Sequence, residues 1–278
     1  MKNLLLRTIT GIFFCALIVA SILIHPLVTG VLFFIITILA LTEYFKFVKK
    51  GSTQKKSVYA MAFLVFLNVT FFYLKMDDTL LLSIPITAIL FFLFPPVFEL
   101  FRKRRKPLNS ISVSYFPIIW IVFPLSLIYF WNIQPEASPL IIALFIIIWL
   151  YDTLAYCAGS LVGKHPLFER ISPKKSWEGF LFSLVITSLL SIGFYYIPYF
   201  NIDIFTTYYH WIGLAVLVII FGTFGDLIES MFKRASKIKD SGKLLPGHGG
   251  ILDRFDSLLL AVPVAYFYYW VIGIILSL

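Results

Sequence analysis

Acidic and basic side chains are concentrated in one stretch of an otherwise apolar chain, residues 226–256. The stretch reads DLIESMFKRASKIKDSGKLLPGHGGILDRFD and lies between two long apolar runs. Its titratable members are Asp226, Glu229, Asp240, Asp253 and Asp256, then Lys233, Arg234, Lys237, Lys239, Lys243 and Arg254, and finally His248. Both signs of charge gathered in one segment of an apolar chain indicate that a charged substrate binds there, together with the ions that neutralise it.

The first acidic pair of this stretch lies on one face of a predicted helix. Asp226, Glu229, Ser230 and Lys233 occupy positions i, i+3, i+4 and i+7, and residues at this spacing share a helix face. Two carboxylates one turn apart can hold a hard divalent cation whose shell is completed by water and phosphate oxygens. Lys233 can meet a phosphate that the cation bridges. An ordinary ion pair between Glu229 and Lys233 is the alternative, but it does not account for Asp226, which lies deeper in the apolar run.

The second acidic pair, Asp253 and Asp256, follows a glycine-rich turn at the start of the last apolar run. The two aspartates are again one helical turn apart, with Arg254 between them. The preceding residues 246–250 read PGHGG, and glycine at this density lets the backbone approach a ligand closely or form an anion-binding nest. His248 can donate to a phosphate oxygen or protonate a leaving group, or it can simply stabilise the turn.

Asp152 is an isolated acid inside an earlier apolar run, about two helical turns from its end. A carboxylate at that depth of a membrane costs about 2.5 to 3.5 kcal/mol, so such residues usually face the interior of a helix bundle or a wet cavity. A functional role is one explanation. A buried ion pair, or a hydrogen bond to Tyr156 on the next turn, is the other.

Residues 172–176, Ser-Pro-Lys-Lys-Ser, are typical of a helix start. Either Ser172 or Ser176 is expected as the N-cap, with Glu178 in the first turn. Such a start directs backbone N–H groups and the adjacent Lys174 and Lys175 toward the membrane surface, an arrangement that suits phosphate. A loop that only determines topology is an equal alternative.

Composition decides which elements must position these residues. The 278-residue chain is 60% hydrophobic and only 13% charged, whereas soluble proteins have roughly 25% charged residues. Apolar runs of about 20 residues are long enough to cross a bilayer as helices. The predicted fold class is an all-α polytopic membrane protein with about nine transmembrane helices. The expected spans are 6–24, 27–47, 58–75, 79–101, 113–131, 138–160, 177–198, 208–229 and 257–277.

The basic residues predict how the spans are oriented. Of the 23 Lys and Arg residues, only Lys75 falls outside the N-terminal tail and the even-numbered connections. The positive-inside rule therefore places the N-terminus in the cytoplasm and the C-terminus outside. The net charge of +9 is explained by this topology and by contact with anionic lipid, and no nucleic-acid partner is expected. Residues 1–135 are predicted to form a lipid-facing scaffold of five spans, and 136–278 a catalytic region of four spans with cytoplasmic loops.

Several of these segments together resemble a known family. Ser230–Arg234 reads SMFKR, followed by Lys239-Asp240, PGHGG at 246–250 and DRFD at 253–256. With Asp152-Thr153 and SPKK at 172–175, the pattern is similar to the signature of the phosphatidate cytidylyltransferases, also called CDP-diacylglycerol synthases. The resemblance covers roughly residues 149–260, and Ser176 stands where threonine would be expected, which preserves the hydroxyl.

The resemblance implies that CTP and phosphatidic acid react to give CDP-diacylglycerol and pyrophosphate, with Mg²⁺ as cofactor. The residues themselves indicate a metal, phosphate and a membrane surface, whereas cytidine and diacylglycerol come from the resemblance alone. A second cation is left open. The resemblance also makes a homodimer an expectation, and the length and compactness of the chain suggest a bacterial inner membrane, with the site facing the cytoplasm.

Both substrates are strongly anionic, so the reaction needs cations more than a strong base. We expect Asp226 and Asp253 as the main metal ligands, with Asp256 and Glu229 as secondary candidates. The other expected catalytic residues are Lys233, Arg254 and His248. The expected substrate-binding residues are Asp152, Ser172, Lys174, Lys175, Ser176, Ser230, Arg234, Lys239, Asp240, Gly249 and Gly250.

Two other functions compete with this hypothesis. A CTP-dependent polyprenol or lipid kinase also uses a nucleotide at the membrane face, but it releases CDP instead of pyrophosphate. An ion-coupled transporter would line its path with buried acids. The acids of this chain cluster at one face, and the outer half of the predicted bundle lacks acids that could continue such a path.

Overall fold

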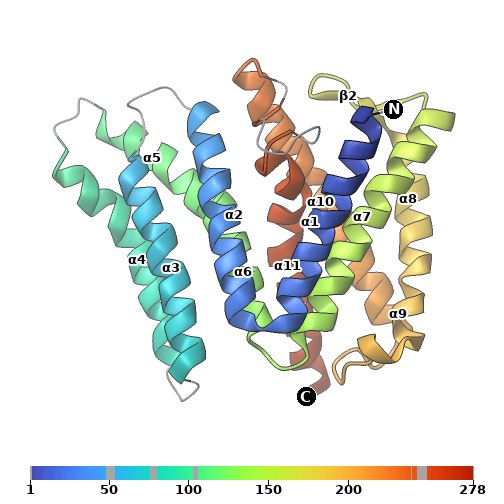
Figure 1. Ribbon diagram of the computed structural model, residues 1–278, viewed down its shortest axis with the longest axis horizontal. Coiled ribbons are helices and arrows are strands. Elements are labelled where there is room, and N and C mark those ends of the chain that lie inside the picture. The colour runs from blue at the N-terminus through green and yellow to red at the C-terminus, as the bar shows by residue number, and fades with distance from the viewer. Residues whose placement is uncertain are drawn as a thin grey trace. The chain divides into compact units, whose positions relative to one another are not determined.

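The computed structural model describes residues 2–47, 54–75, 80–102, 106–238, 240–242 and 249–277. These residues form helices and one short β-hairpin (Figure 1). In chain order the elements are α1 (Lys2–Ile24), α2 (Pro26–Phe47), α3 (Lys55–Lys75), α4 (Leu80–Leu100), α5 (Pro107–Pro117), η1 (Ile118–Val122), α6 (Phe123–Asn132), α7 (Ala137–Val162), β1 (Pro166–Phe168), β2 (Ser172–Ser176), α8 (Trp177–Leu190), α9 (Ile192–Tyr196), η2 (Pro198–Phe200), α10 (Tyr208–Ala235) and α11 (Leu252–Ser277).

The helices agree with the predicted membrane spans. Seven helical segments in the described part of the chain are long and apolar enough to cross a membrane, and α1 and α4 contribute two shorter apolar segments, Thr8–Ile24 and Phe91–Leu100. The prediction of an all-α, multi-pass membrane protein is therefore confirmed. The orientation of its termini stays a prediction.

The two spans that flank the charged stretch extend further than hydropathy predicts. The α10 helix continues beyond 229 to Ala235, and α11 begins at Leu252 instead of 257. A helix satisfies its own backbone hydrogen bonds, so it can continue past the apolar core of the bilayer into polar sequence. As a result both acidic pairs of the charged stretch lie within regular helix.

The chain divides into two compact units. Unit 1 consists of Met1–Ile133 and Asp240–Arg254, and unit 2 of Gln134–Lys239 and Phe255–Leu278. The segment 240–254 of the charged stretch therefore belongs to the same unit as α1–α6, and the boundary crosses the first turn of α11.

In unit 1, α2 packs against α1, α3 and α6. Phe33 and Leu41 of α2 are fully buried, as are Met61 of α3 and Leu125 of α6. The amide of Asn132 donates to Thr29 Oγ1 at 2.9 Å, so this buried polar side chain is hydrogen-bonded. These contacts make α2 the central helix of this unit.

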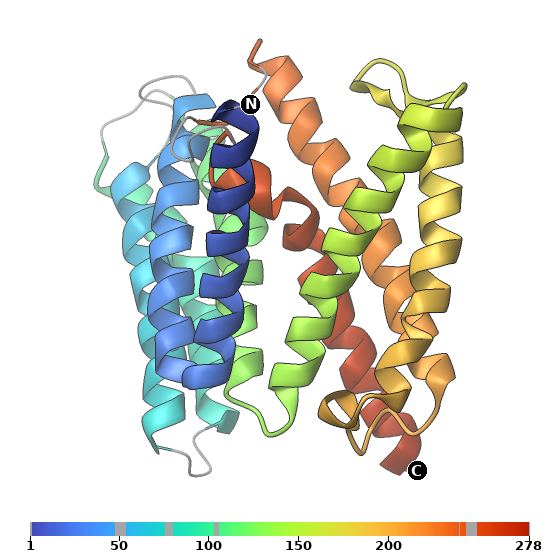
Figure 2. The ribbon, with the colours of Figure 1, turned by 45° about the vertical axis from the view of Figure 1, so that its right-hand side comes forward.

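In unit 2, α7 packs against α8 and α10 (Figure 2). The approach of α7 and α8 depends on glycine. A Cβ at Gly179 would lie 2.9 Å from the carbonyl oxygen of Ala155 and 3.1 Å from Gly159 Cα, so no side chain fits there. Tyr151 and Thr223 join α7 to α10 through a hydrogen bond of 2.6 Å between their hydroxyls.

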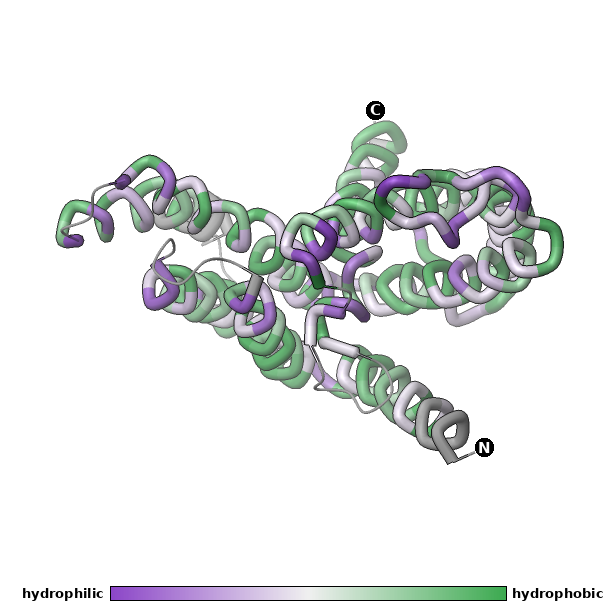
Figure 3. Tube along the Cα trace, turned by 90° about the horizontal axis from the view of Figure 1, so that it is seen from above, coloured by the Kyte–Doolittle hydropathy of each residue, from purple (hydrophilic) through white to green (hydrophobic). Residues whose placement is uncertain are grey.

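The connection between α7 and α8 is an antiparallel hairpin of β1 and β2, and it is visibly hydrophilic among the apolar helices (Figure 3). Of the two expected N-caps, Ser176 is the one observed. Its hydroxyl accepts a hydrogen bond from Gly179 N at 3.2 Å at the start of α8. Ser172 as a cap is wrong, because it pairs with Phe168 in the hairpin. Lys174 and Lys175 therefore lie on a strand before the helix.

Candidate active site

Unit 2 contains a cavity of about 440 Å³ between α7, the hairpin and the start of α8. Five of the predicted substrate-binding residues line it: Asp152, Ser172, Lys174, Lys175 and Ser176. The aromatic rings of Tyr151, Tyr156 and Phe180 form an apolar part of the cavity wall. The hairpin thus brings two lysines and two hydroxyls against an acid of α7, which combines groups for an anionic ligand with apolar surface for an organic one.

Lys175 connects this cavity to the charged stretch. Its ammonium forms an ion pair with the Asp226 carboxylate of α10, 51 residues away in the chain. Burial lowers the pKa of Lys175, but attraction to Asp226 and the hydrogen bond to it outweigh this effect and raise the pKa above its ordinary value. Lys175 is therefore a fixed positive charge at neutral pH.

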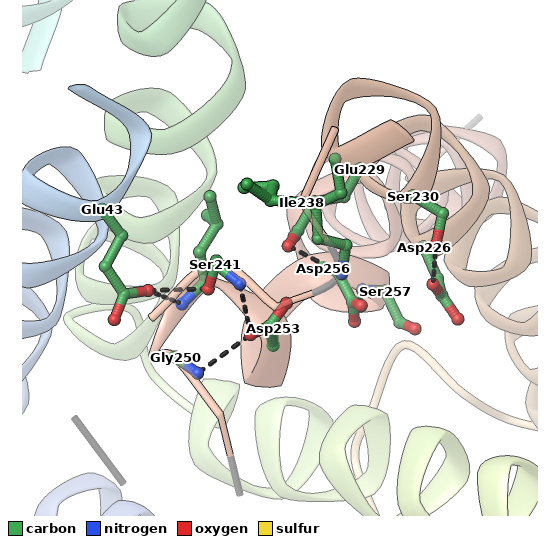
Figure 4. A network of polar contacts seen from close by, with 12 residues as sticks. Glu43, Asp226, Glu229, Ser230, Ile238, Ser241, Gly250, Asp253, Asp256 and Ser257 are labelled. Carbon is green, nitrogen blue, oxygen red and sulfur yellow. Dashed lines mark hydrogen bonds and ion pairs between the residues drawn. The ribbon is translucent and has the colours of Figure 1, made fainter. Parts of the chain in front are cut away.

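The predicted helix face from Asp226 to Lys233 is present on α10. Ser230 Oγ donates to Asp226 Oδ1 at 3.2 Å (Figure 4). Lys233 Nζ lies 3.2 Å from Glu229 Oε1, and these two residues are only 7% and 1% exposed. The ordinary ion pair between Glu229 and Lys233 therefore exists, while Asp226 belongs to a separate contact with Lys175.

Asp256 of α11 adds a further carboxylate to this region of unit 2. Its carboxyl group interacts electrostatically with Asp226, Glu229, Lys233 and Asp152. The α10 and α11 backbones approach closely here, since a Cβ at Gly225 would lie 2.5 Å from the carbonyl oxygen of Asp256. The four acids and the two lysines of α10 and the hairpin form one group of charges, which we call the acid–lysine cluster. Its members are Asp152, Asp226, Glu229 and Asp256, with Lys175 and Lys233.

Within the described residues, no three His, Cys, Asp or Glu side chains are placed to hold a metal ion by themselves. Mg²⁺ does not require such a cage, because it usually keeps several waters and binds one or two carboxylates together with substrate phosphates. The carboxylate of Asp226, whose partner Lys175 lines the cavity, and that of Asp256 have the donor chemistry that fits this mode.

The rest of the charged stretch lies in unit 1. The Asp253 carboxylate accepts hydrogen bonds from the backbone N–H groups of Ser241 at 2.8 Å and Gly250 at 2.9 Å (Figure 4). Gly249 has a φ of +82°, and a Cβ on it would lie 2.9 Å from Asp253 Oδ2. The glycines of PGHGG that the structure describes thus allow the backbone to close around this carboxylate.

Sequence reasoning missed Glu43 of α2. Its carboxylate accepts hydrogen bonds from the N–H groups of Ile251 and Leu252 and from the Ser241 hydroxyl. The signal that could have found it is the one that drew attention to Asp152, because Glu43 is also an acid inside an apolar span.

Other predicted residues make different contacts. The Arg234 side chain donates to the carbonyl oxygens of Ile171 at 3.4 Å and Ile238 at 3.3 Å, which ties the end of α10 to the hairpin. Arg254 and Asp240 are exposed in unit 1. Lys239 and His248 lie outside the described residues.

Comparison with known proteins agrees with these features. The family model described as "Cytidylyltransferase family" matches residues 5–272. A phosphatidate cytidylyltransferase of Staphylococcus aureus (strain COL) is 41% identical over 136 residues, which cover 49% of this chain and 51% of that protein. One from Staphylococcus haemolyticus is 44% identical over 138 residues, with the same coverage.

The chain spans about half the length of the curated relatives it matches. The family model, in contrast, extends over nearly the whole chain and includes every element from α2 to α10 and most of α1 and α11. On this match, the chain belongs to the cytidylyltransferase family.

Proposed function

We propose that this protein is a phosphatidate cytidylyltransferase, which converts CTP and phosphatidic acid to CDP-diacylglycerol and pyrophosphate. The observation that carries the proposal is the cavity of unit 2, where Lys174 and Lys175 stand beside Asp152 and Lys175 is paired with Asp226. The relatives named phosphatidate cytidylyltransferase support the choice of substrates.

The cavity suits two anionic reactants. Lys174 and Lys175 can offset the repulsion between a lipid phosphate and the nucleotide phosphates. Because the pKa of Lys175 is raised, its charge is present throughout the neutral range. Substrate phosphate competes with Asp226 for the Lys175 ammonium, so substrate binding can release the carboxylate to another cation.

The carboxylates suit a magnesium ion. We propose that Asp226 and Asp256 hold it, and that substrate phosphates complete its shell. Bound Mg²⁺ supplies neutralisation of the charge that develops on the phosphoryl oxygens. Glu229 is less suitable than the sequence suggests because Lys233 already pairs with it. Asp253, one turn before Asp256 in the sequence of α11, remains a candidate ligand for a second cation.

The reaction itself needs little proton transfer. An oxygen of the phosphatidate phosphate, already ionised, attacks the α-phosphorus of CTP, and a new phosphorus–oxygen bond forms. The bond between the α-phosphorus and the bridging oxygen breaks, and pyrophosphate leaves with that electron pair. Lys174 and Lys175 orient the phosphates and lower the energy of the crowded negative charge. Arg254 and His248 are proposed to assist at the leaving pyrophosphate.

We propose that the cavity opens to the cytoplasm and to the inner leaflet of a bacterial inner membrane. The support is the distribution of Lys and Arg along the sequence and the bacterial origin of the relatives. A homodimer is part of the same proposal and rests on the family resemblance alone.

The test measures pyrophosphate release by the purified protein in detergent, with CTP and phosphatidic acid, with and without Mg²⁺. Asp226→Asn should lower the rate on the order of 100-fold or more. Asp203→Asn is the matched control, because it is the same change at an exposed aspartate of unit 2 that does not line the cavity. Release of CDP with a lipid alcohol as acceptor would instead identify a kinase, and the absence of both products would exclude both enzymes.

A further inference from the structure

Glu43 is an acidic residue near the C-terminal end of the apolar helix α2 and is fully buried, with 0% of its surface exposed. Within unit 1 its carboxylate accepts three hydrogen bonds, from Ser241, Ile251 and Leu252. Oε1 accepts from Ile251 N at 3.1 Å. Oε2 accepts from Leu252 N at 2.9 Å and from Ser241 Oγ at 2.9 Å. The chain positions joined in this way are up to 209 residues apart.

The backbone around Glu43 is shaped to its carboxylate. A Cβ at Gly242 would collide with Glu43 Oε1, and a Cβ at Gly250 would collide with Oε2 and with the Ser241 hydroxyl. Glycine therefore lets two parts of the chain close around one buried anion. A carboxylate has enough lone pairs for all three donors, and the first N–H groups of α11 have no partners within their own helix.

The same backbone segments hold Asp253. Ser241 makes two contacts, since its hydroxyl donates to Glu43 and its N–H donates to Asp253 at 2.8 Å. Gly250, which packs on Glu43, donates its N–H to Asp253 at 2.9 Å. Figure 4 shows Glu43 on one side of this short segment and Asp253 on the other.

We propose that Glu43 is a positioning residue for Asp253. By binding Ser241, Ile251 and Leu252 it fixes the two N–H groups that orient the Asp253 carboxylate, and so it sets the affinity of that carboxylate for a divalent cation. The inference rests on the proposed function, in which Asp253 is a candidate cation ligand. Glu43 itself does not touch substrate or cation in this proposal.

Glu43→Gln tests the proposal because it keeps size and shape and removes acceptor capacity. Whichever way the new amide turns, its NH₂ group faces either Ile251 N–H or Leu252 N–H, and two donors then oppose each other. Glu99→Gln is the matched control. Glu99 is also a buried acid of unit 1, 5% exposed, and its carboxylate accepts hydrogen bonds from Gln54, Arg102 and Ser110.

The experiment has two readouts on the full-length protein in detergent. Hydrogen–deuterium exchange of peptides covering 249–258 reports the backbone around Asp253 without any need for activity. The Mg²⁺ concentration that gives half-maximal pyrophosphate release reports the cation affinity. For Glu43→Gln we expect faster exchange in this peptide, and a half-saturating Mg²⁺ concentration raised roughly tenfold with little change in the KM for CTP. Glu99→Gln should change neither readout.

Three results would overturn the proposal. They are unchanged exchange at 249–258 in Glu43→Gln, an unchanged Mg²⁺ requirement in an active variant, or equal effects of Glu43→Gln and Glu99→Gln on Mg²⁺ dependence. If Glu43→Gln does not fold, Ser241→Ala replaces it. This change removes only the hydroxyl contact to Glu43 and should give the same two effects in weaker form, and their absence counts against the proposal. If the wild type releases no pyrophosphate, the proposed function fails, while the exchange experiment still decides whether Glu43 orders this segment.

Discussion

The ion pair between Lys175 and Asp226 joins the two parts of unit 2 in which chemistry was expected. The lysine comes from the hairpin strand β2, and the aspartate comes from α10. Each was a candidate on its own, Lys175 for phosphate and Asp226 for a cation. Their contact places the proposed cation site next to the proposed phosphate site, so a substitution at either residue should alter binding at both sites.

Lys175→Ala should therefore remove both the proposed contact to substrate phosphate and the ion pair with Asp226. We expect kcat/KM for pyrophosphate release to fall on the order of 100-fold, the usual effect of removing one donor that stabilises a charged transition state. Lys164→Ala is the control, because Lys164 is an exposed lysine of the same connection that does not line the cavity. Equal activity of the two variants would contradict a role for Lys175.

The raised pKa of Lys175 gives a prediction for pH. A lysine whose folded pKa lies above its ordinary value of 10.5 keeps its positive charge at all pH values below 10.5 and loses it only as pH rises through the folded pKa. Titration of Lys175 should therefore cause no fall in activity below about pH 10. The check compares pH profiles of wild type and Lys175→Arg. An alkaline fall that begins near pH 8 in wild type and is absent in the arginine variant would show that the pKa is lowered instead.

At the scale of elements, the close approach of α10 and α11 brings Asp256 into the acid–lysine cluster. Gly225 permits this approach, because the carbonyl oxygens of Asp256 and Ser257 lie within 2.5 Å and 3.3 Å of where its Cβ would be. Backbone oxygens cannot turn aside as a flexible side chain can. The two helices must therefore move apart if this glycine is replaced.

Gly225→Ala should destabilise the protein by about 1 to 3 kcal/mol, the usual cost of overpacking a well-filled contact, and should lower pyrophosphate release. Thermal unfolding in detergent measures the first effect. Gly193→Ala is the control, since a Cβ at Gly193 meets nothing within 4 Å. If the two alanine variants had the same unfolding temperature, the contact between α10 and α11 would not be as tight as this geometry requires.

At the scale of the whole molecule, the chain crosses the membrane several times, and its orientation can be measured directly. Replacing Cys15 and Cys157, the two cysteines of the chain, leaves a background for single cysteines at exposed loop positions. In intact cells, a membrane-impermeant maleimide should label Asn201→Cys and should not label Lys164→Cys until the membrane is opened. The reverse pattern would invert the orientation and place the cavity outside.

The sequence by itself determined the class of fold and the position of the charged stretch at residues 226–256. Apolar runs of bilayer length specify helices because only helices satisfy their backbone hydrogen bonds in lipid. The face shared by Asp226 and Ser230 was predictable from helix spacing, and the contact between their side chains follows that spacing. Ser176 could be recognised as one of two cap candidates because capping depends on a few neighbouring residues.

Only the tertiary structure decided which of these residues meet. The pairing of Lys175 with Asp226, and of Glu43 with Ile251, joins positions 51 and 208 residues apart. Local spacing encodes helices and caps because their contacts are a few residues long. Contacts between distant segments depend on how whole helices pack. That packing has no regular residue spacing by which the sequence could predict it.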